Sequence, residues 1–287
     1  MRAAIKLVFV GTSIGLYLLT GLVASIVVRN PIRRRRAQIA SIRFWSIVIG
    51  FMMGIRVKVI GSERIDRDKP VFLVCNHVSF LDMMVLSGVA PAGMVTSVEV
   101  QETFGLGAIA RLGGSLFVER RDRSKLPQEK QQIARVMIDE KLSILVFPEG
   151  TSSNASGVLP FKAALFDCAI YAGVHVQPMV LHYAKINGRV PDQELLDNAL
   201  YYGDMEFMPQ FMKVLALRSL EVEVRILPEI SAAGLDPEGP GRKDLAERTH
   251  SLISETYGKL RPTVAASNDQ SVSRTHISSI NRPITER

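Results

Sequence analysis

The residues best suited to chemistry are a histidine and an aspartate five positions apart. His77 comes just after Val71–Cys75, an apolar run with the length and composition of a buried strand. In α/β domains, residues that follow such strands lie at the carboxyl end of the sheet, where sites are usually found. Because five positions on a helix correspond to about 500° of rotation, His77 and Asp82 would not share a helical face. We therefore expect His77 before a helix and Asp82 in its first turn.

In this arrangement Asp82 could accept a hydrogen bond from one imidazole nitrogen and leave the other nitrogen as a base. A neutral imidazole is suited to removing the proton of an alcohol that attacks a thioester, and such a base typically contributes ~10²–10⁴ in rate. The same residues allow a second interpretation. Ser79-x-x-Asp82 resembles a capping box with Asp in place of Glu, and His77 would then be only a turn residue.

A pair of arginines forms a second cluster. Arg120 and Arg121 follow the short apolar strand predicted at Leu116–Val118. A guanidinium presents a planar fork of N–H donors that matches a phosphate group. The alternative is a solvated patch of charge, and this cluster alone does not decide between the two.

A third cluster follows the strand predicted at Ser143–Phe147. Its sequence is Phe147-Pro148-Glu149-Gly150-Thr151-Ser152-Ser153. A glycine beside small hydroxyl residues allows backbone N–H groups to approach an anion. An ordinary Pro/Gly turn is the alternative interpretation.

Taken together and in this order, the clusters resemble the sequence blocks of the glycerolipid acyltransferase family, which includes the lysophosphatidic acid acyltransferases. The matching blocks are Asn76-His77-x-Ser79-Phe80-Leu81-Asp82, Gly114-x-Leu116-Phe117-Val118-x-Arg120, Phe147-Pro148-Glu149-Gly150-Thr151 and, more weakly, Val176-Gln177-Pro178-Met179. The resemblance covers about residues 57–185.

The resemblance implies a role for each matching residue. His77 would be the general base and Asp82 its partner. The glycerol-phosphate end of the acceptor would be held by Arg120, Glu149, Gly150 and Thr151, with Lys162 as a weaker candidate for the same region. Neither a metal, nor a cofactor, nor a covalent acyl-enzyme is implied, because the hydroxyl attacks the thioester of acyl-CoA or acyl-ACP (acyl carrier protein), the co-substrate, directly.

The expected acceptor is a lysophospholipid, in the first place 1-acylglycerol-3-phosphate. One departure from the family pattern bears on this choice: many lysophosphatidic acid enzymes carry a basic residue where this chain has Ser152. Another lysolipid, such as lyso-ornithine lipid or a lysophospholipid with a head group, therefore stays open. A lipid hydrolase is less favoured, because neither Gly-x-Ser-x-Gly nor His-Glu-x-x-His occurs in the sequence. An inactive adaptor would be expected to have damaged blocks, and these are intact.

The elements that must position these residues alternate between strand-like and helix-like patterns. Strands are predicted at Val71–Cys75, Met94–Val98, Leu116–Val118, Ser143–Phe147 and Val176–His182, and helices near 80–88, 104–112, 125–141, 162–172 and 242–260. This alternation predicts an α/β fold, with a central mixed sheet flanked by helices. We assign residues 61–262 to the acyltransferase domain. Residues 263–287 are rich in Ser, Thr, Asn and Arg and are predicted to form a disordered tail.

The N-terminal segment is unlike the remainder in charge. Residues 1–60 contain ten Lys or Arg and no Asp or Glu, so the other 227 residues hold 25 basic and 28 acidic side chains. A nucleic-acid-binding protein carries its basic surface on the folded domain, so nucleic acid is not an expected partner. The pattern favours the anionic surface of a membrane, and membrane lipids as partners.

A membrane helix is predicted within this segment. Leu7–Val28 has no charged residue, and a helix of that length spans ~33 Å. The arginines that follow predict that its C-terminal end faces the cytoplasm, and they disfavour the alternative of a cleaved signal peptide. We therefore assign 1–36 to a transmembrane anchor with a basic flank, and expect the active domain on the cytoplasmic face (the inner or plasma membrane in a bacterium).

The next segment, 37–60, is predicted to be an interfacial amphipathic helix. Its apolar stretch Trp45–Ile55 is too short to cross a bilayer unaided, and it has basic residues at both ends. An ordinary buried helix of the soluble domain is the alternative.

Overall fold

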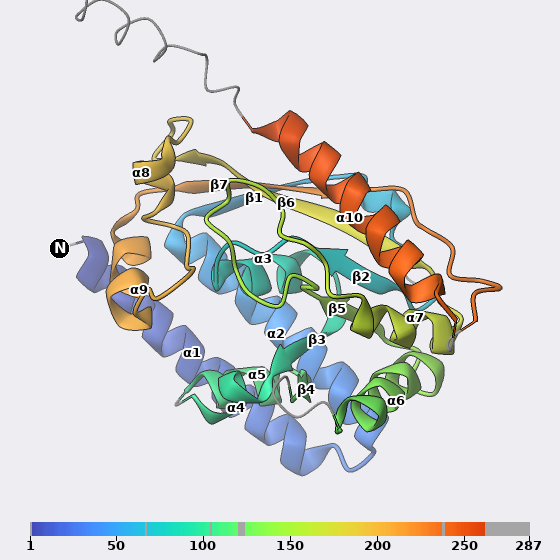
Figure 1. Cartoon of the computed structure of the whole chain (residues 1–287). Coiled ribbons are helices and arrows are strands. Elements are labelled where there is room, and N and C mark those ends of the chain that lie inside the picture. The colour runs from blue at the N-terminus through green and yellow to red at the C-terminus, as the bar shows by residue number, and fades with distance from the viewer. Residues whose placement is uncertain (1, 67, 104, 120–123, 237–238, 262–287) are drawn as a thin grey trace, which may run out of the picture.

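The computed structural model describes residues 2–66, 68–103, 105–119, 124–236 and 239–261. Its centre is a seven-stranded sheet (Figure 1). The strands are β1 (Ile55–Ile60), β2 (Phe72–Cys75), β3 (Ala92–Ser97), β4 (Leu116–Val118), β5 (Ser143–Val146), β6 (Val176–Ile186) and β7 (Leu220–Ile226).

The sheet is mixed, as the sequence predicts. Its strand order is β1-β7-β6-β2-β5-β3-β4, and only the β6–β7 pair is antiparallel among these neighbours. The carboxyl ends of the parallel strands β2, β5, β3 and β4 therefore lie at the same end of the sheet. Chain segments that follow these strands meet there, which is the usual location of a ligand site in an α/β sheet.

Helices cover both faces of the sheet. They are α1 (Arg2–Val27), α2 (Pro31–Met53), α3 (Leu81–Val89), α4 (Val98–Glu102), α5 (Leu106–Leu112), α6 (Leu126–Ile138), α7 (Asp167–Ala172), α8 (Gln193–Leu196), α9 (Phe207–Ala216) and α10 (Gly241–Leu260), with short 3₁₀ turns at Ser62–Arg64 and Ala163–Phe166. The β2–α3–β3 crossover runs in the opposite direction across the sheet from the crossovers that contain α6 and α7. Right-handed crossovers of opposite direction place their helices on opposite faces. Accordingly α2 packs against α3, whereas α10 packs against β6 (Figure 1).

The core is continuous through the sheet, and β2 is its most buried part. All four residues of β2 have at most 1% of their surface exposed. A strand buried on both faces is expected to be an uninterrupted apolar run, which is how this segment appears in the sequence. The rigid strand delivers the next residues, Asn76 and His77, to the sheet edge.

The segment expected as an interfacial helix at 37–60 needs correction. α2 begins earlier, at Pro31, with the Asn30 side chain accepting a hydrogen bond from the N–H of Arg33. It ends at Met53, and Gly54 follows with a left-handed φ of 79°. Residues 55–60 are then not helical but form β1, paired with β7. The sequence interpretation extended the helix too far because it gave Gly54 no weight as a terminator.

α1 lies along the α/β domain and does not project from it. The Nζ of Lys6 donates hydrogen bonds to the carbonyls of Met53 and Leu217. Further along, the Tyr17 hydroxyl donates to the carbonyl of Ile109, and Gly21 lies against Leu112. Within the described residues this is the one helix long and apolar enough to cross a membrane, from Ala3 to Val27.

Candidate active site

His77 and Asp82 lie together as their spacing predicts. His77 precedes α3 and Asp82 is in the first turn of this helix. The Nδ1 of His77 is 2.9 Å from Oδ2 of Asp82. Asp82 is fully buried, whereas the His77 side chain is 19% exposed. The pair therefore combines a shielded carboxylate with an imidazole that solvent can reach.

The Asp82 carboxylate also caps the start of α3. Its Oδ2 accepts hydrogen bonds from the N–H groups of Val78 and Ser79, at 2.6 and 2.8 Å. One side chain thus makes the backbone hydrogen bonds of the capping interpretation and also contacts the imidazole, so the catalytic interpretation stays a prediction beside it. These bonds fix the carboxylate, and a fixed carboxylate assigns the proton to Nδ1 of His77 and the lone pair to Nε2.

Tyr183 is a third member of this group that the sequence did not indicate. Its hydroxyl donates a 2.7 Å hydrogen bond to Oδ1 of Asp82. Burial, together with the nearby charge of Asp82, raises the pKa of the Tyr183 hydroxyl well above its ordinary value. Tyr183 therefore stays protonated and serves as a donor. A tyrosine in an apolar strand is typical of a core, so no sequence signal distinguished it.

The imidazole is further held by Phe147, the first residue after β5. The two rings are stacked, with centroids 4.2 Å apart and an interplanar angle of 19°. Among the residues the structure describes, none forms a hydrogen bond to Nε2 of His77. With one face covered and Nδ1 occupied, the ring leaves Nε2 as its available nitrogen.

Glu149 lies behind His77. Its Oε1 accepts a hydrogen bond from the backbone N–H of His77 at 2.7 Å, and its Oε2 accepts one from the N–H of Leu159 at 2.8 Å. Burial raises the pKa of the Glu149 carboxyl from 4.5 to about 7, although these N–H groups act in the opposite direction. The side chain is 3% exposed. It therefore joins the loop after β5 to the residue that precedes α3.

The loop after Glu149 turns sharply at Gly150, where φ is 74°. A Cβ atom at this position would lie 2.5 Å from Nζ of Lys162. The structure thus brings Lys162, predicted for the same anionic region, over the backbone of Gly150. Thr151 follows on the exposed side of the loop. Arg120, also predicted for this region, lies outside the described residues.

The segment around Tyr201 connects the two motifs. The backbone N–H of Tyr201 donates to the carbonyl of Val78, and its own carbonyl accepts a hydrogen bond from the Ser152 hydroxyl. The Ser79 hydroxyl donates to the carbonyl of Ala199. Ser152 therefore has a structural partner in this loop. In the described part of the chain, no group of three His, Cys, Asp or Glu side chains is arranged to hold a metal ion.

Comparisons with known proteins identify the family. Residues 56–182 match the family model described as Acyltransferase. The chain is 35% identical over 189 residues to a lyso-ornithine lipid O-acyltransferase of Rhizobium meliloti (strain 1021), covering 63% of this chain and 64% of that protein. It is 32% identical over 189 residues to the protein of the same name from Brucella abortus (strain 2308), covering 63% of this chain and 70% of the relative.

A solved structure has the same fold. It is the 1-acyl-sn-glycerophosphate acyltransferase of Thermotoga maritima, with a TM-score of 0.63 and 21% sequence identity, covering 91% of this chain and 98% of that one. The matched family region contains His77, Asp82 and Glu149, the residues that the structure places in contact. From the family match, the relatives and the geometry of this site, the chain belongs to the acyltransferase family.

Proposed function

We propose that this chain is a lysolipid O-acyltransferase and that its acceptor is a lyso-ornithine lipid. The observation that supports the reaction is the contact between His77 Nδ1 and Asp82 Oδ2. The imidazole is stacked on Phe147 on one face and is still partly exposed to solvent. The observation that supports the acceptor is the similarity to two relatives that carry this name. The acceptor expected first from the sequence, 1-acylglycerol-3-phosphate, becomes the competing substrate.

The reaction proceeds by direct transfer. Nε2 of His77 takes the proton of the acceptor hydroxyl while the oxygen attacks the thioester carbonyl carbon. A new C–O bond forms, the C–S bond breaks, and the thiolate of the carrier leaves with the proton from the imidazolium. Asp82 stabilises the imidazolium through Nδ1–H and keeps the ring in the productive tautomer. The donor is the thioester of coenzyme A or of acyl carrier protein.

We assign Glu149 to positioning, since both of its oxygens hold backbone N–H groups. The residues that would bind the anionic groups of the substrates are then Lys162, the backbone around Gly150, Thr151 and, by the family resemblance, Arg120. Ser152 supports an acceptor that carries less phosphate charge, because serine is uncharged and its hydroxyl is engaged with the carbonyl of Tyr201. A basic side chain at this position would add a cation to the same loop.

The apolar surface of α1 supports attachment to a membrane. Its outward residues include Val8, Ile26 and Val27, each at least 66% exposed. Arg33 to Arg36 follow within α2 and favour an anionic lipid surface. We propose that this face anchors the chain and that the α/β domain lies on the cytoplasmic side, where both acyl donors occur.

The acceptor assignment is tested with the full chain in detergent. Lyso-ornithine lipid and 1-acylglycerol-3-phosphate are offered separately and in competition, each with acyl-CoA and with acyl-ACP, and products are measured by mass spectrometry. We expect kcat/KM for lyso-ornithine lipid to be higher by about tenfold or more, or about 1.4 kcal/mol in transition-state binding. A preference for the phosphate-bearing acceptor would reject this assignment and retain the reaction type.

The catalytic assignment has its own control. His77→Ala removes the base and should lower kcat by roughly 10²–10⁴ with either acceptor. His175→Ala serves as the matched histidine variant, because His175 lies before β6 and its carbonyl pairs with the N–H of Phe72 at the opposite end of the strand from His77. Appreciable turnover by the His77 variant would remove this residue from the mechanism.

A further inference from the structure

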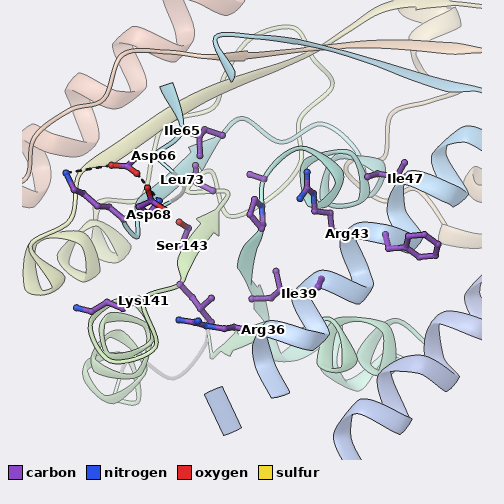
Figure 2. Close-up of a pocket in the computed structure, with 16 residues that line it drawn as sticks. Arg36, Ile39, Arg43, Ile47, Ile65, Asp66, Asp68, Leu73, Lys141 and Ser143 are labelled. Atoms are coloured by element: carbon purple, nitrogen blue, oxygen red, sulfur yellow. Dashed lines mark hydrogen bonds and ion pairs between the residues drawn. The ribbon is translucent and has the colours of Figure 1, made fainter. Parts of the chain in front are cut away.

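Figure 2 shows a cavity, of about 630 Å³, whose lining includes Leu73 near the amino end of β2. His77 follows the opposite, carboxyl end of this strand. The cavity is bounded by α2 on one side and by residues near the amino ends of β2 and β5 on the other. Figure 2 shows Ile39 and Arg43 extending from α2, across the cavity from Leu73 and Ser143. The cavity is therefore separate from the candidate active site, which lies at the carboxyl ends of the central strands.

Two arginines of α2 give the cavity its charge. Arg36 donates a hydrogen bond to the carbonyl of Glu140 at 2.8 Å, and Arg43 donates one to the carbonyl of Gly88 at 3.4 Å. In the described ranges of the chain, neither guanidinium has a carboxylate within 4 Å. Each guanidinium has further N–H donors beyond this one hydrogen bond, so both can bind an anion.

The other charged groups do not cancel this preference. Asp66 and Asp68 line the far side of the cavity from Arg43 (Figure 2), and Asp66 pairs with Lys69 at 3.7 Å. Lys141 adds a further cation to the lining. The cavity lining therefore has four basic and two acidic side chains, and both arginines are on the α2 side.

The cavity continues into an apolar groove. A second space of about 490 Å³ lies between α2, α3 and β1, and it shares Arg43, Ile47 and Ile65 with the first. Phe51, Val57, Val59 and Met84 line this second space. A charged compartment thus opens into a hydrophobic one, with Arg43 at the junction.

The groove is continuous with the exposed apolar side of α2. Phe44, Ile47 and Phe51 are 58, 54 and 83% exposed, and their spacing places them on one helical face. Solvent exposure of large apolar side chains in such a row marks an interaction surface. The arrangement of cations beside an apolar groove on this surface matches an amphiphile with an anionic head.

We propose that this cavity binds one anionic phospholipid of the bilayer, with its phosphate between Arg36 and Arg43 and an acyl chain in the groove beside Ile47. The source of the lipid rests on the proposed membrane attachment, whereas the binding chemistry rests on the cavity alone. The bound lipid would fill the space between α2 and the sheet and would make α2 selective for anionic membranes. Neither the acyl donor nor the acceptor would occupy this cavity.

Binding is tested with the full chain freed of lipid in detergent and titrated with dioleoyl phosphatidylglycerol or dioleoyl phosphatidylcholine. Native mass spectrometry should detect one phosphatidylglycerol per chain and weaker retention of phosphatidylcholine. Arg36→Gln and Arg43→Gln should each weaken phosphatidylglycerol binding by about fivefold, as expected for one basic group near an anionic lipid. Glycerol 3-phosphate, which has the charged group without a chain, should fail to displace the lipid.

The matched control is Arg33→Gln, which removes the same charge from an exposed position on the same helix outside the cavity. A general surface attraction would make this variant as weak as Arg36→Gln, and that result would overturn the proposal. Ala40→Trp provides a second variant, because Ala40 lines the cavity at an exposed position. It should reduce lipid binding without changing any charge, and unchanged binding would also overturn the proposal.

These measurements are independent of the proposed function. Arg36→Gln and Ala40→Trp should keep the turnover of the unmodified chain in detergent, since the cavity is at the opposite end of the sheet from His77. Failure of the acceptor assay would leave lipid binding intact. Conversely, a chain that acylates normally but binds both phospholipids equally would disprove only the lipid site.

Discussion

The hydroxyl of Tyr183 lies 2.7 Å from Oδ1 of Asp82, on the oxygen that His77 does not use. The carboxylate is thereby held from two sides, by β6 through Tyr183 and by the start of α3 through backbone N–H groups. Because Asp82 is fully buried, loss of any one donor is not compensated by water. The orientation of the imidazole therefore depends on Tyr183, a residue of β6 that acts through Asp82.

Tyr183→Phe tests this dependence. The substitution keeps the ring and removes the donor, which leaves a buried oxygen without its partner at a cost of about 1–3 kcal/mol. We expect kcat to fall roughly tenfold while KM for both substrates stays unchanged. Tyr257→Phe is the matched control, because that buried hydroxyl donates to the carbonyl of Ala155 and not to Asp82. Equal losses of kcat in both variants would point to a purely structural effect.

Asp82→Asn tests the charge of the pair. The amide has nearly the shape of the carboxylate, and its oxygen would take the Oδ2 position, where three N–H groups point, so the ring would keep its tautomer. The negative charge that stabilises the imidazolium would be lost, and kcat should fall by roughly 10²–10⁴. Ser79→Ala removes a neighbouring hydroxyl that binds the carbonyl of Ala199 and should retain most of the activity. Near-normal turnover by Asp82→Asn would argue against the pair.

Glu149 gives the stability of the protein a defined pH dependence. The carboxyl loses its proton near pH 4.5 in the unfolded chain and near pH 7 in the folded one. Between these values the folded state binds more protons, so the free energy of unfolding should fall as pH rises through this window. The total change is roughly 3 kcal/mol at most.

Glu149→Gln removes the titrating group and should abolish this component of the pH dependence. Thermal midpoints of both proteins in detergent, measured from pH 5 to 8, provide the comparison. The difference between the two midpoints should change with pH mainly in the window given above. A pH-independent difference would show that the Glu149 carboxyl does not titrate there.

The packing of α1 on α5 can be tested at Gly21. A Cβ atom at this position would lie 2.9 Å from Cβ of Leu112, whereas one at Gly15 would meet nothing within 4 Å. Gly21→Val should therefore destabilise the fold by about 1–3 kcal/mol through steric conflict. Gly15→Val introduces the same side chain on the same helix and should leave the thermal midpoint nearly unchanged. Equal midpoints would mean that α1 does not pack against α5.

The sequence identifies elements well where local pattern and burial agree. β2, β5 and β6 are apolar runs between turn signals, and the structure places them side by side at the centre of the sheet. β1 was missed because its six residues follow α2 with a single glycine between them, and the apolar stretch before it dominates the pattern. The strand becomes evident only through its pairing with β7, more than 160 residues away.

In the candidate site too, contacts between neighbours in sequence could be predicted and contacts between distant residues could not. His77 and Asp82 are five residues apart, so their spacing alone predicts how they meet. Tyr183 contacts Asp82 across 101 positions, and nothing local distinguishes it from an ordinary core tyrosine. Glu149 was expected to face the acceptor, but its hydrogen bonds to His77 and Leu159 depend on the adjacency of β2 and β5. Such contacts follow from the topology of the sheet and not from a motif.

The attachments of α1 at Lys6, Tyr17 and Gly21 have a mechanical consequence. A hydrophobic helix fastened near both ends moves with the imidazole as a single rigid body. Under the proposed membrane attachment and mechanism, the depth of this helix in the bilayer would set how far a lysolipid must rise from its leaflet before its hydroxyl reaches Nε2. Outward-facing side chains of α1, remote from every reacting atom, would in this way adjust the energetic cost of presenting the acceptor.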